Sequence, residues 1–246
     1  MTTETHAPDR SSGSGPLARS LVKLAGTPDD ASDLDAQLVA IAQLAVECLP
    51  AVAYSSTTAL REKAYTTVAA TSALAAAVDD AQYDARSGPC LEALESGAPV
   101  AVPDMATTMQ WPGFRRTARR LGLDASLSIP LFAGRGDAVA SMNLYSRDKT
   151  AMADVAAHVR AAFGTGDSAP PKRRHTARPP ATGADELAAG LVEALAVRDR
   201  IQLAIGMVAG RARCTATDAY VSLRVRAAEA GVPLLEIATR TLRRLP

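Results

Sequence analysis

A proline-rich segment most constrains how this chain of 246 residues can fold. Residues 164–183 contain four prolines, three glycines and a basic cluster. Proline removes a backbone donor and restricts the residue before it, so neither a helix nor a central strand can run through this segment. The sequence therefore predicts a semi-extended, basic linker at 164–183 that divides the chain into two folding units.

The part before this linker mixes helical and strand patterns. Apolar residues recur at helical spacing over 34–49, behind an aspartate-rich stretch that can cap a helix. Further helices are predicted over 73–83, 90–94, 111–121 and 152–163, and strands over 51–60, 64–70, 98–104 and twice within 126–146. The pattern predicts an α+β domain over residues 31–163, with an antiparallel sheet and flanking helices.

The N-terminal residues predict neither a signal peptide nor a membrane anchor. The first sixteen are polar and rich in Pro, Gly and Ser, and a disordered leader is expected over 1–30. The longest stretches of low charge, such as 64–78, are shorter than the roughly 20 apolar residues of a spanning helix. A cytoplasmic protein without membrane contact is the resulting expectation.

After the linker the pattern is entirely helical. One helix is expected over about 184–209, a second opens at a capping box formed by Thr215 and Asp218, and a third follows Pro233. They predict a three-helix, all-α domain over 184–246. The first helix, roughly 40 Å long, needs a partner along its apolar stripe. A dimer seam between two copies is predicted at Leu187, Leu191, Ile201 and Ile205.

The net charge of the chain changes sign at the predicted linker. Residues 1–163 hold 14 Lys and Arg against 18 Asp and Glu, and residues 164–246 hold 13 against 8. The two parts thus carry net charges of −4 and +5, which sum to the overall +1. An excess of arginine is typical of modules that bind phosphates, although a GC-rich genome, in which arginine replaces lysine, would give the same pattern without a functional reason.

The C-terminal part resembles the ANTAR domain, the RNA-binding module of transcription antitermination regulators. Three segments in order carry the resemblance: ALAVRDRIQLAIGMV at 194–208, DAYVSLRVRAAE at 218–229 and LLEIATRTL at 234–242. Ile205 stands where the family often has lysine. The resemblance implies binding to paired stem-loops in nascent mRNA by a homodimer.

The preceding part resembles the GAF domains that stand before ANTAR domains in actinobacterial proteins. The matching segments are DDAQYDARSGPCLEALESGAPVAVPD at 79–104, WPGFRRTARRLGLDASLSIPLF at 111–132 and SMNLYS at 141–146. Such GAF domains act as signal-input modules. The resemblance therefore implies a GAF-ANTAR regulator whose small-molecule signal the sequence does not identify.

Arginine and aromatic side chains are the candidates for RNA contact, because guanidinium groups bind phosphates and both groups stack on bases. The candidates are Arg198, Arg211, Arg213, Tyr220, Arg224 and Arg226. Each arginine can equally be a solvated surface residue, and Tyr220 lies at a position that suits the helical core. Arg198 can instead pair with an acidic residue of a second chain.

Cys90 is a candidate redox sensor, because it follows Gly88 and Pro89 at a helix N-terminus, where the dipole lowers a thiol's pKa. A buried, inert cysteine is the alternative. The scattered Cys and His residues predict no metal site and no cofactor, and the sequence has no catalytic motif. Two other functions stay open: a small-molecule receptor whose C-terminal helices serve only dimerisation or partner binding, and a DNA-binding protein.

Overall fold

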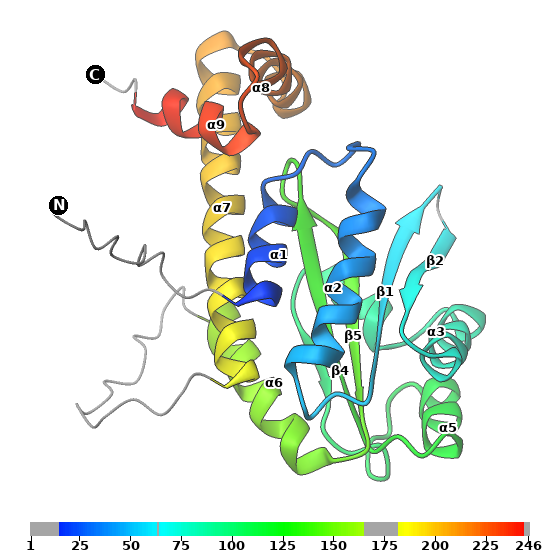
Figure 1. Ribbon diagram of the computed structural model, residues 1–246. Coiled ribbons are helices and arrows are strands. Elements are labelled where there is room, and N and C mark those ends of the chain that lie inside the picture. Colours follow the sequence, from blue (N-terminus) through cyan, green and yellow to red (C-terminus); the bar gives the residue numbers. More distant parts are fainter. Residues whose placement is uncertain (1–14, 63, 165–181, 244–246) are drawn as a thin grey trace, which may run out of the picture.

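The N-terminal part of the chain is built on one antiparallel sheet. The computed structural model describes residues 15–62, 64–164 and 182–243 (Figure 1). The five strands lie in the order β2-β1-β5-β4-β3. They are β1 (Tyr54–Arg61), β2 (Ala64–Ala70), β3 (Val100–Val102), β4 (Ala125–Ala133) and β5 (Asp137–Ser146). This sheet and its helices confirm the predicted α+β class.

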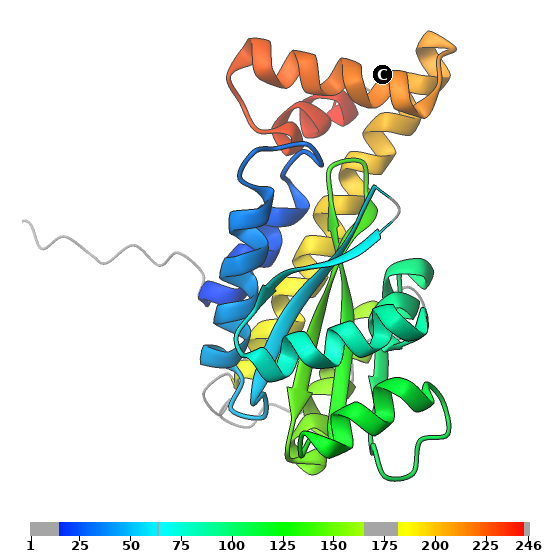
Figure 2. The ribbon, with the colours of Figure 1, turned by 90° about the vertical axis from the view of Figure 1, so that its right-hand side faces the viewer.

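Helices cover both faces of the sheet (Figure 2). One face carries α1 (Pro16–Ala25), α2 (Leu34–Cys48), α6 (Lys149–Phe163) and the first half of α7 (Gly183–Ala212). The other face carries α3 (Ala73–Ala85), α4 (Pro89–Ser96) and α5 (Pro112–Arg120). Because side chains alternate along a strand, β5 sends Met142 and Leu144 into the first layer and Asn143 and Tyr145 into the second.

The C-terminal part is the predicted three-helix unit. The second half of α7 packs with α8 (Ala216–Ala230) and α9 (Leu234–Arg243) around a second core, to which Ala25 at the end of α1 also contributes. Thr215 and Asp218 form the expected capping box at the start of α8. A second capping box, between Thr182 and Asp185, opens α7. None of the described helices is long and apolar enough to cross a membrane.

Helix α1 corrects the prediction of a disordered leader over residues 1–30. Residues 1–14 lie outside the described part of the chain, but α1 follows directly and buries Leu17, Leu21 and Leu24 almost completely. Its partner is α7, where Gly190 permits close contact: a Cβ atom on this glycine would lie 2.5 Å from the Cα atom of Ala18. Three leucines at helical spacing are an amphipathic stripe, and the polar residues before them obscured it.

The predicted linker over 164–183 lies outside the described residues except at its ends. Thr182 and Gly183 open α7, whose 30 residues correspond to about 45 Å. The first half of α7 belongs to the core of the sheet domain through Leu187 and Leu191, and its second half belongs to the three-helix core. One continuous helix thus joins the two units.

The predicted dimer seam is buried within a single chain. Leu187 and Leu191 are 0% and 3% exposed, in the layer formed with α1 and α6. Ile201 and Ile205 lie in the three-helix core. The prediction that these four side chains join two copies is therefore wrong for this structure. The apolar stripe of α7 is covered by other helices of the same chain. Helical periodicity shows that such a stripe is buried, but it does not show whether the same chain or a second copy covers it.

Candidate functional site

The free end of the three-helix unit is basic. Arg211 of α7 and Arg226 of α8 line one groove of about 230 Å³, whose other lining residues include Met207 and Thr241. Arg213 follows as the residue that ends α7, with a left-handed φ of 52°. Cations are favoured at a helix C-terminus, so the end of α7 supports both Arg211 and Arg213. Three of the six predicted RNA contacts therefore gather at one end.

These three arginines are available to an anion. Among the described residues, none forms an ion pair or a side-chain hydrogen bond with Arg211, Arg213 or Arg226. Arg211 and Arg213 are exposed, and Arg226 is half-buried. An unpaired guanidinium keeps its donors free for a phosphate or a base edge.

The other three predicted contacts face the sheet domain instead. Arg198 donates from Nε to the carbonyl oxygen of Gly136 at 2.7 Å, and its guanidinium lies 4.1 Å from the centre of the Phe132 ring. The pairing of Arg198 with an acidic residue of another chain stays a prediction, because the contacts of this side chain within the chain use only Nε and the ring face. Arg224 forms an ion pair with Asp30.

Tyr220 is a core residue rather than an exposed stacking platform. It is 3% exposed, and its hydroxyl donates to Oδ1 of Asp29 at 2.8 Å. Burial and the hydrogen bond to Asp29 raise the pKa of this phenol, which therefore stays a donor. The prediction that Tyr220 stacks on a base is corrected for this arrangement. Sequence reasoning missed Asp29 as the partner of Tyr220 and Asp30 as the partner of Arg224, although two adjacent aspartates are a visible signal in the sequence.

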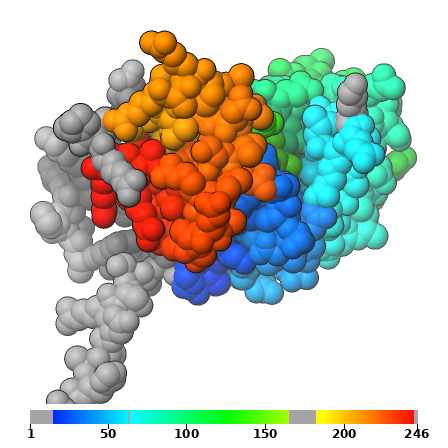
Figure 3. Space-filling view, turned by 90° about the horizontal axis from the view of Figure 1, so that it is seen from above, coloured from blue at the N-terminus to red at the C-terminus, as the bar shows by residue number. Residues whose placement is uncertain are grey.

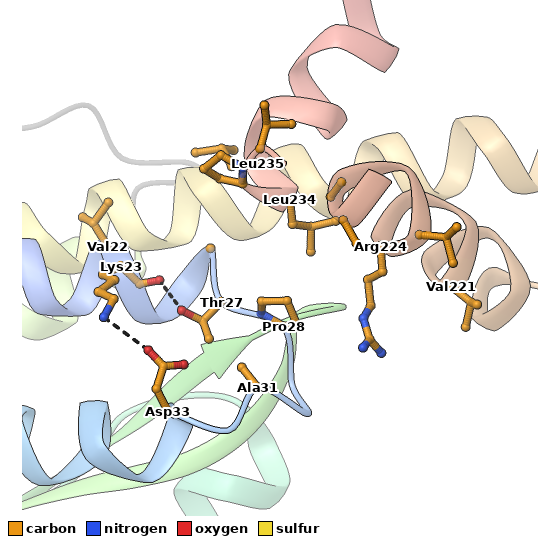
Figure 4. A pocket seen from close by; sticks show the side chains of 16 residues that line it. Val22, Lys23, Thr27, Pro28, Ala31, Asp33, Val221, Arg224, Leu234 and Leu235 are labelled. Carbon is orange, nitrogen blue, oxygen red and sulfur yellow. Dashed lines mark hydrogen bonds and ion pairs between the residues drawn. The ribbon is translucent and has the colours of Figure 1, made fainter. Parts of the chain in front are cut away.

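A second groove, of about 830 Å³, lies where α1 and residues 26–33 face α8 and α9 (Figure 4). Its walls are mostly apolar, as the side chains of Val22, Val221 and Leu234 illustrate. An ion pair of 3.4 Å between Lys23 and Asp33 lies on one side of it. The groove leaves this part of the junction loosely packed.

A polar cluster fills the space between the sheet and α3. At its centre is Asp79, which is 0% exposed. The Tyr145 hydroxyl donates to Oδ1 of Asp79 at 2.6 Å, and the Thr67 hydroxyl donates to Oδ2 at 3.0 Å. Asn143 also donates to Oδ1, at 3.3 Å. Burial raises the pKa of Asp79 to about 6, against the hydrogen bonds that lower it.

Comparison with known families assigns both units. The model of the GAF domain matches residues 31–165, and the model of the ANTAR domain matches residues 189–241. The chain is a GAF-ANTAR protein. A comparison with curated proteins finds no match. Among solved structures, it is similar to a type II free methionine-R-sulfoxide reductase from Thermoplasma acidophilum, at 14% identity and a TM-score of 0.37, covering 57% of this chain and 88% of that one.

Cys90 of the GAF-ANTAR protein is not the low-pKa thiol expected at a helix N-terminus. It is 0% exposed, and burial together with the nearby Asp79 carboxylate raises its pKa well above the usual range. Its backbone amide donates to Oε1 of Gln82 at 3.0 Å. Desolvation outweighs the helix dipole here, so the redox prediction is corrected: the thiol is protonated and enclosed.

The buried carboxyl of Asp79 predicts a pH dependence of stability. Its folded pKa of about 6 exceeds the ordinary 3.8, so the folded state binds the proton more tightly. The contribution of Asp79 to stability should therefore be complete below about pH 4 and decline by about 2 to 3 kcal/mol as the pH rises to about 6. Urea unfolding of Asp79→Asn at several pH values should show no such decline in the free energy of unfolding. Asp80→Asn, at the exposed neighbour, is the matched control and should retain it.

Proposed function

We propose that this GAF-ANTAR protein binds stem-loops in nascent mRNA through α7, α8 and α9 and so prevents terminator formation. ANTAR domains are RNA-binding antitermination domains, and GAF domains sense small molecules. The observation that carries the proposal is the cluster of Arg211, Arg213 and Arg226, whose side chains have no ion-pair partner within the part of the chain that the structure describes. In this proposal the chain is a cytoplasmic binding protein and not an enzyme, and the GAF domain controls it.

The basic end suits an RNA hairpin in shape as well as charge. Guanidinium forks bind phosphates in two-donor geometry and also stack on unpaired bases, which are the groups that a hairpin loop exposes. Among the described residues, no atom outside the helix lies within 4 Å of a Cβ atom added to Gly206 or Gly210 of the same helix. This open backbone allows a nucleotide to approach α7 closely.

Charge reversal tests the proposal directly. In Arg211→Glu/Arg226→Glu, the removal of two guanidinium groups should weaken RNA binding by at least about tenfold. The slope of log affinity against log salt should shrink by about 0.7 for each phosphate of a single strand that the variant no longer neutralises. Crosslinking in cells, with recovery of bound RNA, and filter binding at several salt concentrations give the two measurements.

The matched control is Arg116→Glu/Arg119→Glu, which makes the same charge change at exposed positions of α5 in the GAF domain. It should leave RNA recovery close to wild type. Equally weakened binding in the two variants would show a general charge effect. Recovery of no RNA by wild-type protein would favour the alternative of a small-molecule receptor whose ANTAR helices only bind a protein partner.

Paired stem-loops call for two RNA-binding units, and we propose a homodimer through a different face of α7. Val192 and Leu203 are 43% and 61% exposed, and Ala196 between them is also exposed. Their separations of four and seven residues fit a heptad seam. Unlike the buried stripe at Leu187 and Leu191, this face is free among the described residues.

A further inference from the structure

We propose that the N-terminal sheet domain holds the ANTAR domain in an autoinhibited arrangement, in which two loops of the sheet domain occupy arginines that RNA would otherwise contact. This inference rests on the proposed RNA-binding function and assigns its regulation. The two loops are residues 26–33, which precede α2, and residues 133–137, which connect β4 and β5. Figure 3 shows α8 and α9, in orange and red, beside the N-terminal segment in blue.

The first loop engages α8 with two adjacent carboxylates. Asp29 accepts a hydrogen bond from the Tyr220 hydroxyl, and Asp30 pairs with Arg224. The Arg224 guanidinium also lies 5.5 Å from the centre of the Tyr220 ring. A carboxylate offers the same kind of acceptor oxygens as a phosphate. Asp30 therefore occupies Nη2 of Arg224, a donor that an RNA phosphate could otherwise use.

The second loop contacts two residues of α7 that lie one helical turn apart. Arg198 donates to the carbonyl oxygen of Gly136, and Gln202, four residues later, donates to that of Arg135. The fit is close, because a Cβ atom on Gly136 would lie 2.3 Å from Nε2 of Gln202. These contacts hold the Arg198 guanidinium against the Phe132 ring, with the Arg198 side chain half-buried.

The two loops form one unit. The amide of Gly134 donates to the carbonyl oxygen of Thr27 at 2.7 Å, and Arg135 bridges Asp137 at 3.0 Å and Asp29 at 3.8 Å. A movement of either loop would therefore disturb the other. Since β4 and β5 belong to the central sheet, a change within the GAF domain has a direct connection to both contacts with the ANTAR domain.

The junction is suited to release rather than to permanent closure. The side chains of Arg224 and Asp30 are 32% and 58% exposed, and ion pairs at such positions are individually weak. The apolar groove beside them leaves α8 without dense packing against residues 26–33. Arg211, Arg213 and Arg226 stay open, so RNA can bind at the free end before it competes for Arg224.

The test removes the acidic contacts and leaves every ANTAR residue unchanged. Full-length Asp29→Ala/Asp30→Ala should bind RNA stem-loops about tenfold more tightly than wild type, within the usual range of coupling between two sites. The probe is a library of stem-loops with randomised loops, at one fixed salt concentration. Removing two negative charges attracts any polyanion, so Asp80→Ala/Asp84→Ala on α3 is the matched control. The proposal requires that Asp29→Ala/Asp30→Ala gain clearly more RNA affinity than Asp80→Ala/Asp84→Ala.

Hydrogen exchange of the wild-type protein gives a second measurement that needs no variant. Saturating RNA should speed exchange of backbone amides at 26–33 and 133–137, because it displaces both loops. Equal RNA affinity in wild type and Asp29→Ala/Asp30→Ala, with unchanged exchange in both loops, would overturn autoinhibition and leave RNA binding intact. Failure of every variant to bind RNA would overturn the proposed function, and the regulation with it.

Discussion

Leu191→Asp is expected to destabilise the fold strongly rather than to separate two stably folded subunits. The side chain is 3% exposed in the core shared by α1, α6 and α7, so the substitution buries an unpaired carboxylate and opens a cavity. The expected loss is about 3 to 5 kcal/mol, a large part of the roughly 5 to 15 kcal/mol of a typical domain. Urea unfolding followed by circular dichroism measures it.

Leu203→Asp is the matched control on the exposed face of the same helix. Leu203 is 61% exposed, and its substitution should change stability by no more than about 0.5 kcal/mol. If the homodimer uses this face, sedimentation should find Leu203→Asp folded and monomeric. A folded, monomeric Leu191→Asp beside a dimeric Leu203→Asp would instead restore the seam predicted from sequence.

Deleting residues 1–26 should have a comparably large effect. The deletion removes α1, and with it the burial of Leu17, Leu21 and Leu24 against α7 and the sheet. At about 1.5 to 3 kcal/mol for each buried leucine, the loss is several kcal/mol, and Tm should fall by about 10 °C or more. A thermal scan by circular dichroism gives the measurement.

Deleting only residues 1–14 is the control, because it leaves all contacts among the described residues in place. A thermal midpoint unchanged by the longer deletion would contradict the role of α1. It would restore the prediction of a leader without structure over residues 1–30.

Local pattern was sufficient to predict most elements of the fold. The alternation in β4 and β5, the turn signals and the spacing of apolar residues in α7, α8 and α9 depend on neighbours within a few positions. The capping box at Thr215 and the core position of Tyr220 follow from the same local rules. These features need no knowledge of distant segments.

Contacts between segments that lie far apart in the chain could not be predicted from the sequence. A stripe such as Leu187 and Leu191 must be buried, but its spacing does not say whether α1 or a second copy covers it. Arg224 likewise has the same local surroundings whether it faces solvent or Asp30, which lies 194 residues away. The free and the engaged arginines could therefore be told apart only in three dimensions.

The continuity of α7 has a consequence for chimeric regulators. Cutting the chain at the linker, to transplant the output helices onto another input module, would remove Leu187 and Leu191 from the core they complete with α1 and α6. The remaining sheet domain would expose that apolar layer to water. During synthesis, too, the first 163 residues cannot close their core until the ribosome has released the start of α7. A functional exchange must therefore splice within α7, after Leu191, so that each recipient keeps the turns its own core requires.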